Sequence, residues 1–357
     1  MSYNKKVTLK HIAKLMGMTP ATISKALRDS DDISENTRKK VKALAEELGY
    51  RPNLMARSLV SQRSFMLGVI VPNLRISFYS EVTRGIYEEA RRHGYEAIIV
   101  VNDDSFENEK RNLEFLSALA VDGILINAVP GEDNNDILKR ISDRGVPFVS
   151  YDRFVENFDF HSVSIDDEGA AFKVIEHLVN EGRKNILFLG PTDNPSVAKG
   201  RYRGYRKALK HFNIEYDSRR VVACVVEEHD AGEKMQQVLD AKIPVDAVMC
   251  VGGLVAYGAG RVILNSQLSI PGDIALAEFG DNDIVARLGV PFLTVYQFPY
   301  EMGVTAVQMV IDLIQKSALL EKPEHKIIPT KLIYHEIGVK SRIVSDVHGS
   351  EIIDNVD

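Results

Sequence analysis

The sequence predicts an α/β protein in which a small all-helical head precedes a larger body of parallel sheets. Three amphipathic segments fill the first fifty residues, whereas from Phe65 onward short apolar runs alternate with helical patterns. This alternation is typical of doubly wound parallel sheets with helices on both faces. Charge changes at the same place: thirteen cations and six anions give residues 1–64 a net charge of +7, which leaves −13 for the rest of a chain of net charge −6. A basic head on an acidic body is typical of a modular nucleic-acid binder.

The three helices of the head carry clear start and stop signals. Thr8 can cap a helix over residues 9–16 with its hydroxyl. Thr19 and Pro20 open the second helix, since a proline in the first turn needs no partner for its missing N–H. Ser34 caps the third. Three short helices with a tight turn between the first two predict a helix-turn-helix.

The second helix presents a small, polar outer face. Its apolar positions point toward the expected core, whereas the opposite side carries Ala21, Thr22, Ser24 and Lys25. Such a face fits a DNA major groove. A small helical bundle used for protein contacts is the alternative, although a protein-contact face more often carries large apolar anchors.

Nine short apolar runs of the body are interpreted as strands. They are Met66–Val71, Glu96–Val101, Gly123–Asn127, Phe148–Tyr151, Asn185–Gly190, Val221–Val226, Ala247–Val251, Ala275–Phe279 and Leu293–Gln297. Helices are expected between them, for example over Tyr79–His93, Glu107–Leu119 and Glu168–Glu181. Ligands of such sheets bind beyond the carboxyl ends of the strands, so we expect a binding site among the loops that follow them.

Other functional classes find little support in the residues. Cys224 and Cys250 lie in apolar runs without metal-ligand spacing, so we expect both in the core of a protein from a reducing compartment. The nine histidines are scattered, and no nucleophile elbow, phosphate loop or dinucleotide fingerprint is present. We therefore expect no metal, no cofactor and no enzyme activity. Without a signal peptide or an apolar run of roughly 18–20 residues, a cytoplasmic protein with no membrane partner is expected.

Residues 7–72 resemble the lactose/galactose repressor family of bacterial transcription regulators. The resemblance runs from Val-Thr-Leu-Lys-His-Ile-Ala through Gly-Tyr-Arg-Pro-Asn-Leu-Met-Ala-Arg-Ser-Leu to Leu-Gly-Val-Ile-Val-Pro, and it continues to about Arg342. It implies a homodimer whose paired heads read a palindromic operator in double-stranded DNA, and a body with two lobes like the periplasmic sugar-binding proteins. The implied organisation is a head over 1–52, a hinge helix over 53–64, a body over 65–342 and a loose tail over 343–357. The first lobe would span about 65–163 and 297–326, and the second about 164–296 and 327–342.

The resemblance also implies the DNA contacts, position by position. Pro20, Ala21 and Lys25 match base-reading positions of the recognition helix, and Thr22, Ser24, Ser34 and Thr37 match phosphate-holding positions. Leu59 matches the hinge leucine that wedges into the central base step, with Asn53, Ala56 and Arg57 beside it. Thr8 and Arg28 complete the expected set. A plain core leucine at Leu59 and a solvated lysine at Lys25 are the alternatives.

The ligand site implied by the resemblance is only partly retained. Phe78 and Tyr79 match stacking positions, Arg201 matches an arginine that forks onto the ligand, and Asn127, Asp152, Arg153, Ser196 and Asp281 complete the expected set. Solvated or interlobe salt bridges are the alternative for the charged members. Sugar-binding members commonly carry Asn-Asp where this chain has Gly252-Gly253, an aspartate where it has Gly280, and an aromatic near Glu227 or Glu228. An unpaired buried hydroxyl costs about 1–3 kcal/mol, so an anionic ligand, a sugar acid or a sugar phosphate, is expected in place of a free neutral sugar.

The expected function is a sequence-specific regulator, in repressor form, whose operator affinity changes when a small sugar-like effector closes the cleft. The dimer is expected to use residues 78–93 and 102–119. Asp346–Asp357 has no apolar heptads, so no tetramer is expected. Two alternatives stay open: a regulator of this fold controlled by a protein partner, and a solute-binding protein without a transcriptional role.

Overall fold

The computed structural model describes residues 7–27, 29–50, 63–131, 133–153, 161–192, 196–280, 282–316, 322–337 and 341–346. The chain divides into two compact units, residues 1–64 and residues 65–357. The first unit is the head and the second is the body. Most of the expected hinge helix, residues 53–62, lies outside the described residues.

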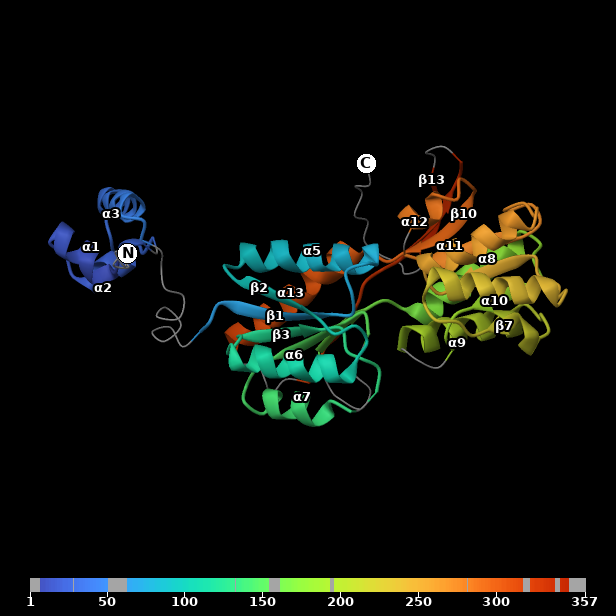
Figure 1. Ribbon diagram of the computed structural model, residues 1–357, viewed down its shortest axis with the longest axis horizontal. Helices are drawn as coiled ribbons and strands as arrows, with labels where there is room; N and C mark the ends of the chain where they lie inside the picture. The colour runs from blue at the N-terminus through green and yellow to red at the C-terminus, as the bar shows by residue number, and fades with distance from the viewer. Residues whose placement is uncertain are drawn as a thin grey trace, which may run out of the picture. The chain divides into compact units, whose positions relative to one another are not determined.

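The head is a three-helix unit with a small core of its own (Figure 1). Its helices are α1 (Leu9–Met16), α2 (Pro20–Leu27) and α3 (Glu35–Glu47). Ile12, Ile23 and Val41 are completely buried, one from each helix. The Thr8 hydroxyl accepts a hydrogen bond from the His11 N–H at 3.4 Å, and Gly17 ends α1 in the left-handed region at φ 64°. The helical head that the sequence predicts is confirmed.

The first lobe of the body is a six-stranded, fully parallel sheet in the order β11-β5-β4-β3-β1-β2. Helices α5 and α13 cover one face, and α6 and α7 cover the other (Figure 1). The strands are β1 (Met66–Val71), β2 (Glu96–Val101), β3 (Gly123–Ile126), β4 (Phe148–Tyr151), β5 (His161–Ser164) and β11 (His325–Ile327). The helices are α5 (Ser77–Arg92), α6 (Phe106–Ala118), α7 (Asn135–Ser142) and α13 (Pro299–Lys316).

The second lobe is a seven-stranded mixed sheet in the order β13-β12-β10-β9-β8-β6-β7. Only β12 and β13 are antiparallel to their neighbours. The strands are β6 (Ile186–Leu189), β7 (Val221–Val222), β8 (Ala247–Cys250), β9 (Ala275–Phe279), β10 (Phe292–Tyr296), β12 (Lys331–His335) and β13 (Ser341–Asp346). The helices are α8 (Asp167–Asn180), α9 (Ser196–His211), α10 (Glu228–Asp240), α11 (Gly253–Asn265) and the short α12 (Asn282–Ala286), with a 3-10 turn at Ser218–Arg220.

The chain passes between the lobes three times. It leaves the first sheet after β5 and enters α8, returns between β10 and α13, and leaves again between β11 and β12. Each lobe is therefore assembled from segments far apart in sequence. Three connecting segments join the two lobes, and a pocket can form where the lobes meet.

Two expectations for the body need correction. The apolar run over residues 221–226 was expected to be one strand, but β7 stops at Val222, because this edge strand pairs only with the short β6. Residues 343–346 were expected to be part of a loose tail. They belong to β13, which pairs with β12 in an antiparallel hairpin. The fold class itself, parallel sheets behind a helical head, is confirmed.

Candidate functional site

The exposed face of α2 is the candidate DNA surface of the head. Ile23 and Ala26 bury the opposite face in the core. Pro20, Ala21 and Lys25 are exposed, and Thr22 and Ser24 are half-buried beside them. The helix is thus fixed by its apolar side and presents the side chains that were expected to meet DNA.

Lys25, the expected base-reading cation, has a partner in the free protein. Its Nζ lies 2.5 Å from Asp32 Oδ2, and both side chains are about half exposed. The hydrogen bond from Lys25 lowers the pKa of the Asp32 carboxyl. Any ligand of this lysine would therefore compete with Asp32.

Hydroxyl groups gather at the first turns of α2 and α3. Thr19 Oγ1 accepts from the Thr22 N–H at 3.1 Å, and Ser34 Oγ accepts from the Thr37 N–H at 3.3 Å. Helix N-termini with hydroxyl caps favour nearby anions such as phosphate groups. The remaining expected DNA contacts, Arg28, Asn53, Ala56, Arg57 and Leu59, lie outside the described residues.

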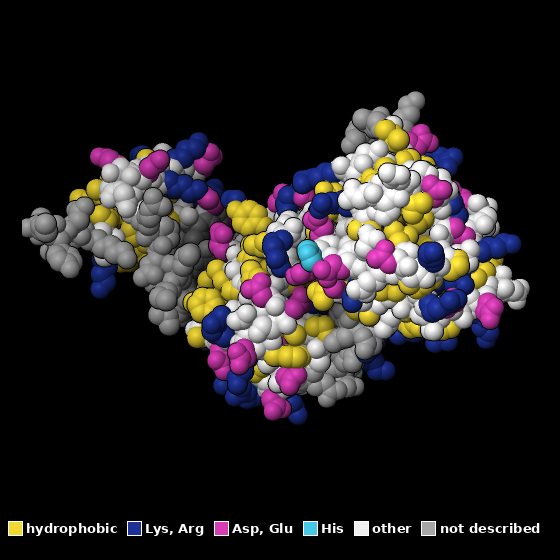
Figure 2. Space-filling model, turned by 45° about the vertical axis from the view of Figure 1, so that its right-hand side comes forward, with side chains coloured by type: hydrophobic (Ala, Val, Ile, Leu, Met, Phe, Trp, Pro, Cys, Tyr) yellow, Lys and Arg dark blue, Asp and Glu magenta, His cyan; other side chains and the backbone are white. Residues whose placement is uncertain are grey.

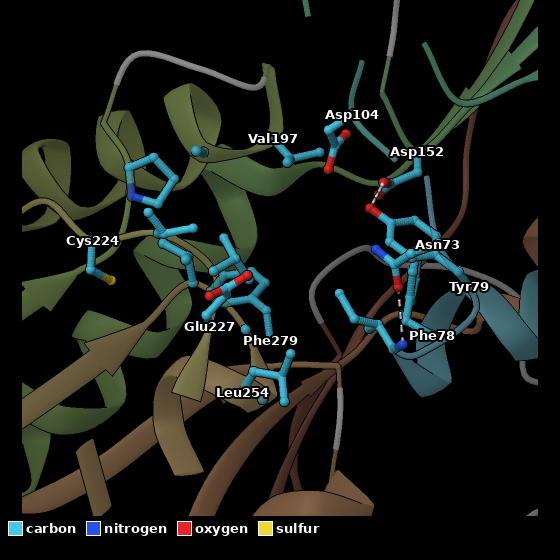
Figure 3. A pocket seen from close by; sticks show the side chains of 18 of the residues that line it. Asn73, Phe78, Tyr79, Asp104, Asp152, Val197, Cys224, Glu227, Leu254 and Phe279 are labelled. Carbon is cyan, nitrogen blue, oxygen red and sulfur yellow. Dashed lines mark hydrogen bonds between the residues drawn. The ribbon is translucent and has the colours of Figure 1, made fainter. Parts of the chain in front are cut away.

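A pocket of about 740 Å³ lies between the two lobes of the body (Figure 3). It opens at the carboxyl ends of strands from both sheets, where the parallel topology predicts a ligand site. Figure 2 shows acidic side chains beside a histidine where the two lobes meet. The lining includes Asn73, Phe78, Tyr79, Asp104, Asp152, Arg153, Val197, Arg201, Cys224, Glu227, His229, Leu254, Phe279 and Gln297.

Asp152 is the central carboxylate of the first-lobe wall. Its Oδ2 accepts from Asn127 Nδ2 at 3.0 Å and, at a longer 3.4 Å, from the Tyr79 hydroxyl. Asp104 and Asp152 both have left-handed backbones, with φ of 52° and 62°. Backbone strain of this kind in non-glycine residues concentrates at functional sites.

Arg153 extends this polar wall by pairing with Asp104 Oδ1 through its Nη1. Its Nε is buried and has no hydrogen-bond partner among the described residues. Burial raises the pKa of the Tyr79 hydroxyl, which therefore stays protonated and can donate. The wall thus offers both donors and acceptors to a hydroxylated ligand.

Arg201 lines the pocket, and each of its three guanidinium nitrogens donates to a protein oxygen. Its Nε donates to Asp167 Oδ1 at 2.7 Å, its Nη1 to the Val251 carbonyl at 2.5 Å and its Nη2 to Gln297 Oε1 at 3.0 Å. The guanidinium also stacks 4.1 Å from the centroid of the Phe279 ring. Burial raises the pKa of the Asp167 carboxyl to about 6, although Arg201 opposes this shift.

Gly280, where the family commonly has an aspartate, borders the same network. Its φ is +86°, and a Cβ there would lie 2.1 Å from Gln297 Nε2. Gln297 thus fills the space that a side chain at position 280 would need. By contrast, a Cβ on Gly252 would meet only Val226, at 3.8 Å.

The expected ligand residues divide into two groups. Phe78, Tyr79, Asp152, Arg153 and Arg201 all line the pocket. Asn127 is completely buried behind the wall and holds Asp152, while Ser196, at the start of α9, is buried and does not line the pocket. Asp281 lies outside the described residues.

Several lining residues were missed by the sequence analysis. They include Asn73, Asp104, Cys224, Leu254, Phe279 and Gln297. Each follows or ends a strand of a parallel sheet, so the carboxyl-end rule could have identified them. Cys224 is buried as expected, but at the pocket wall, where burial raises the pKa of its thiol to about 12.

A helix-turn-helix head and a two-lobed body with a pocket between its lobes together define a ligand-responsive, DNA-binding transcription regulator. Residues 8–53 match the family model for bacterial regulatory proteins of the lacI family, and residues 64–336 match the model for periplasmic binding proteins and the sugar binding domain of the LacI family. The chain therefore belongs to the LacI family of bacterial transcription regulators. The resemblance stated from the sequence is confirmed.

Relatives and solved structures agree with this assignment. The chain is 30% identical over 331 residues to the transcriptional regulator RegA of Clostridium saccharobutylicum, covering 92% of this chain and 97% of the relative. It is 29% identical to the transcriptional repressor CytR of Escherichia coli, covering 86% of this chain and 90% of the relative. These relatives are regulators, and the chain is a regulator and not an enzyme.

Two similar structures contain ligands or DNA. One is the lac repressor dimer bound to operator and the anti-inducer ONPF, with a TM-score of 0.80, 25% identity and coverage of 92% of this chain and 98% of that one. The other is the complex of the regulator CelR with cellobiose, with a TM-score of 0.69, 26% identity and coverage of 93% and 100%. Within the described residues, no helix is long and apolar enough to cross a membrane. No three His, Cys, Asp or Glu side chains of that part of the chain are grouped to hold a metal ion.

Proposed function

We propose that this regulator is a repressor that binds a palindromic operator as a homodimer and changes its operator affinity when a small carbohydrate-like effector occupies the pocket. The observation that carries the proposal is the pocket between the lobes, where Arg201 joins polar groups from two of the three crossing segments in a protein with a DNA-binding head. Because the target is chromosomal DNA, we place its action in the cytoplasm.

The surface of the first lobe supports the homodimer. Tyr87 on α5, Ile99 on β2 and Phe115 on α6 are large apolar side chains that are 41%, 39% and 48% exposed. β2 is the edge strand of its sheet. Exposed apolar groups beside an open sheet edge are typical of a protein interface. A two-fold dimer through this surface would give two heads for a two-fold operator.

The pairing of the pocket arginines supports a neutral effector, which revises the anionic effector expected from the sequence. Arg153 is already paired with Asp104, and Arg201 with Asp167. Asp152 and Glu227 add negative charge to the lining. A sugar acid or sugar phosphate would have to displace one of these carboxylates and would meet the others, so we propose an uncharged, hydroxyl-bearing compound.

Selection from a random pool of double-stranded DNA, at physiological salt and with the full chain, tests the DNA part of the proposal. We expect a two-fold palindrome with a flexible pyrimidine–purine step at its centre. An enriched site without two-fold symmetry would contradict the dimeric reading. Leu59→Ala, which removes the proposed wedge, should then weaken binding to the selected site.

The contacts proposed for α2 and α3 predict different losses. Lys25→Ala should cost about 1–3 kcal/mol on the selected site and relax its sequence preference, because it removes a base contact. Thr37→Val should weaken binding evenly over all sequences, because it removes only a phosphate contact. Equal losses on all sequences for Lys25→Ala would remove the base-reading role.

A further inference from the structure

The two walls of the pocket differ in chemistry. The first-lobe wall carries the Asp152 and Asp104 carboxylates, the Arg153 guanidinium, the Asn73 amide and the Tyr79 hydroxyl. Asn73 Oδ1 accepts from the backbone of Arg75 and Ile76, at 3.1 and 3.2 Å. Its Nδ2 has no hydrogen-bond partner among the described residues. In Figure 3 this side chain faces the pocket beside Phe78 and Tyr79.

The second-lobe wall is apolar over most of its described surface. Its side chains come from the start of α9, the loop after β7, the start of α11 and the end of β9 (Figure 3). They are Val197, Ala198, Cys224, Val225, Val226, Val251, Leu254 and Phe279. Phe279 is 3% exposed and packs its ring face on Arg201.

Several polar groups of the second-lobe wall either have protein partners or lie at its edge. Each of the three guanidinium nitrogens of Arg201 donates to a protein oxygen. Glu227 and His229 are exposed, at the start of α10. Among the described residues, the interior of this wall therefore offers few side-chain partners for ligand hydroxyls. The backbone at the start of α11 is different: its N-cap, Gly252, makes no side-chain capping bond, so an N–H there can donate to an acceptor atom.

We propose that the effector has two unlike ends: a sugar ring whose hydroxyls bind the first-lobe wall, and a flat apolar ring, free of hydroxyl groups, that lies against the second-lobe wall. This inference rests on the proposed function and specifies the ligand class of its pocket. A second sugar ring would bury hydroxyls against Leu254, Val226 and Phe279, and each unpaired hydroxyl weakens binding by about tenfold. An apolar ring gains affinity from the same surface. The pocket volume, about 740 Å³, is within the range of sites for ligands of two rings.

A thermal-shift panel on the full-length protein tests the inference. The probes are glucose, galactose and xylose, the phenyl glycosides of these three sugars, cellobiose and lactose, phenol, and adenosine and uridine. We expect a phenyl glycoside to raise the melting temperature at concentrations at least tenfold below those needed for its parent sugar or for phenol alone. The nucleosides should bind more weakly than the phenyl glycosides, because their bases carry polar groups that the apolar wall leaves unpaired. Comparison of the phenyl glycosides with the nucleosides distinguishes a ligand with an apolar ring from a ligand with a polar base.

Two variants of similar size distinguish the effect of wall polarity on binding from a general loss of folding. Leu254→Gln places an amide in the wall, whereas Leu254→Met keeps it apolar with little change in volume. We expect Leu254→Gln to weaken binding of the two-ring probe at least tenfold and Leu254→Met to weaken it less than threefold. The melting temperature without ligand reports whether either variant is folded. Equal affinities for the two variants would overturn the assignment of the apolar ring to this wall.

The outcomes also separate this inference from the proposed function. Binding of cellobiose or lactose more tightly than every phenyl glycoside and nucleoside would overturn the two-ended ligand and leave a sugar-responsive repressor intact. A protein that binds its selected operator but responds to no probe would overturn both the inference and control by a small carbohydrate-like effector. Control by a protein partner would then be favoured.

Discussion

Arg201 in α9 and Asp167 at the start of α8 form an ion pair of 2.7 Å at the base of the pocket, although 33 positions separate them in the sequence. Their side chains are 8% and 11% exposed. Asp167 directly follows the first crossing between the lobes, and Gln297, another partner of Arg201, lies at the second. Arg201 therefore connects the second lobe to two of the three connecting segments.

Arg201→Ala should destabilise the body by roughly 3–5 kcal/mol, because it leaves the buried Asp167 carboxylate without its cation. Urea unfolding of the full chain measures the loss. Arg203→Ala on the same helix is the matched control: Arg203 is 62% exposed and pairs with Glu168, so its loss should cost at most about 1 kcal/mol. Similar losses of unfolding free energy in both variants would mean that the Arg201–Asp167 pair does not stabilise the junction between the lobes.

The buried Asp167 also predicts a pH dependence of stability. Its pKa is raised from 3.8 to about 6 in the folded protein. Between pH 3.8 and pH 6 the Asp167 carboxyl is therefore protonated in the folded state and ionised in the unfolded state. Its contribution to stability is therefore full below about pH 4 and is lost as pH rises through 6, by about 3 kcal/mol. Asp167→Asn has no carboxyl at this position and should not show this loss. Between pH 4 and 7 the free energy of unfolding of the variant should therefore rise relative to that of the unmodified protein. Parallel curves would contradict the prediction.

The Lys25–Asp32 pair predicts that Asp32 restrains DNA binding. Asp32→Asn should tighten binding to the selected operator by up to about fivefold, because the exposed ion pair holds Lys25 only weakly. Asp31→Asn removes the same charge from the neighbouring exposed position without releasing Lys25. If both variants tighten binding equally in titrations at one salt concentration, the cause is the overall charge and not the freed lysine.

Gly280→Ala should destabilise the body by roughly 1–2 kcal/mol or more. Alanine at this position would have to adopt a left-handed backbone conformation, and its Cβ would collide with Gln297, a partner of Arg201. Gly252→Ala, in an extended backbone with only Val226 at 3.8 Å, should change stability little. Thermal unfolding of the two variants provides the comparison, and an unchanged Gly280→Ala protein would show that Gln297 moves freely.

Phe115→Asp should convert the proposed homodimer to monomers, because it places a charge in the apolar surface over α5, β2 and α6. Tyr216→Asp is the control: Tyr216 is similarly exposed, at 43%, but lies on the second lobe. Sedimentation velocity of both variants checks the prediction. Dissociation by Tyr216→Asp, with no effect of Phe115→Asp, would place the interface on the other lobe.

The parts of the fold that the sequence predicted well depend on local signals. The helices of the head begin at Thr8, Thr19 and Ser34 because a hydroxyl accepts from an N–H three residues later. The strands β1, β2, β4 and β9 have the predicted bounds, since each is a short, mainly apolar run that the local sequence indicates. The strands β5 and β11 were missed because they are short and mostly polar, and they pair with each other across a large separation in sequence. The strands β12 and β13 were missed because polar residues interrupt their apolar residues.

For the pocket, the sequence by itself determined the resemblance to a family, and this resemblance placed Tyr79, Asp152 and Arg201 at one site. Only the tertiary structure decided what these residues do there. Arg201 was expected to bind a ligand, but its three nitrogens already donate to Asp167, Val251 and Gln297, because a buried guanidinium must be paired. Asn127 holds Asp152 from behind. Such pairings join segments that are far apart in the chain, so no local sequence pattern predicts them. Helix caps and strand periodicity, by contrast, depend on a few consecutive residues.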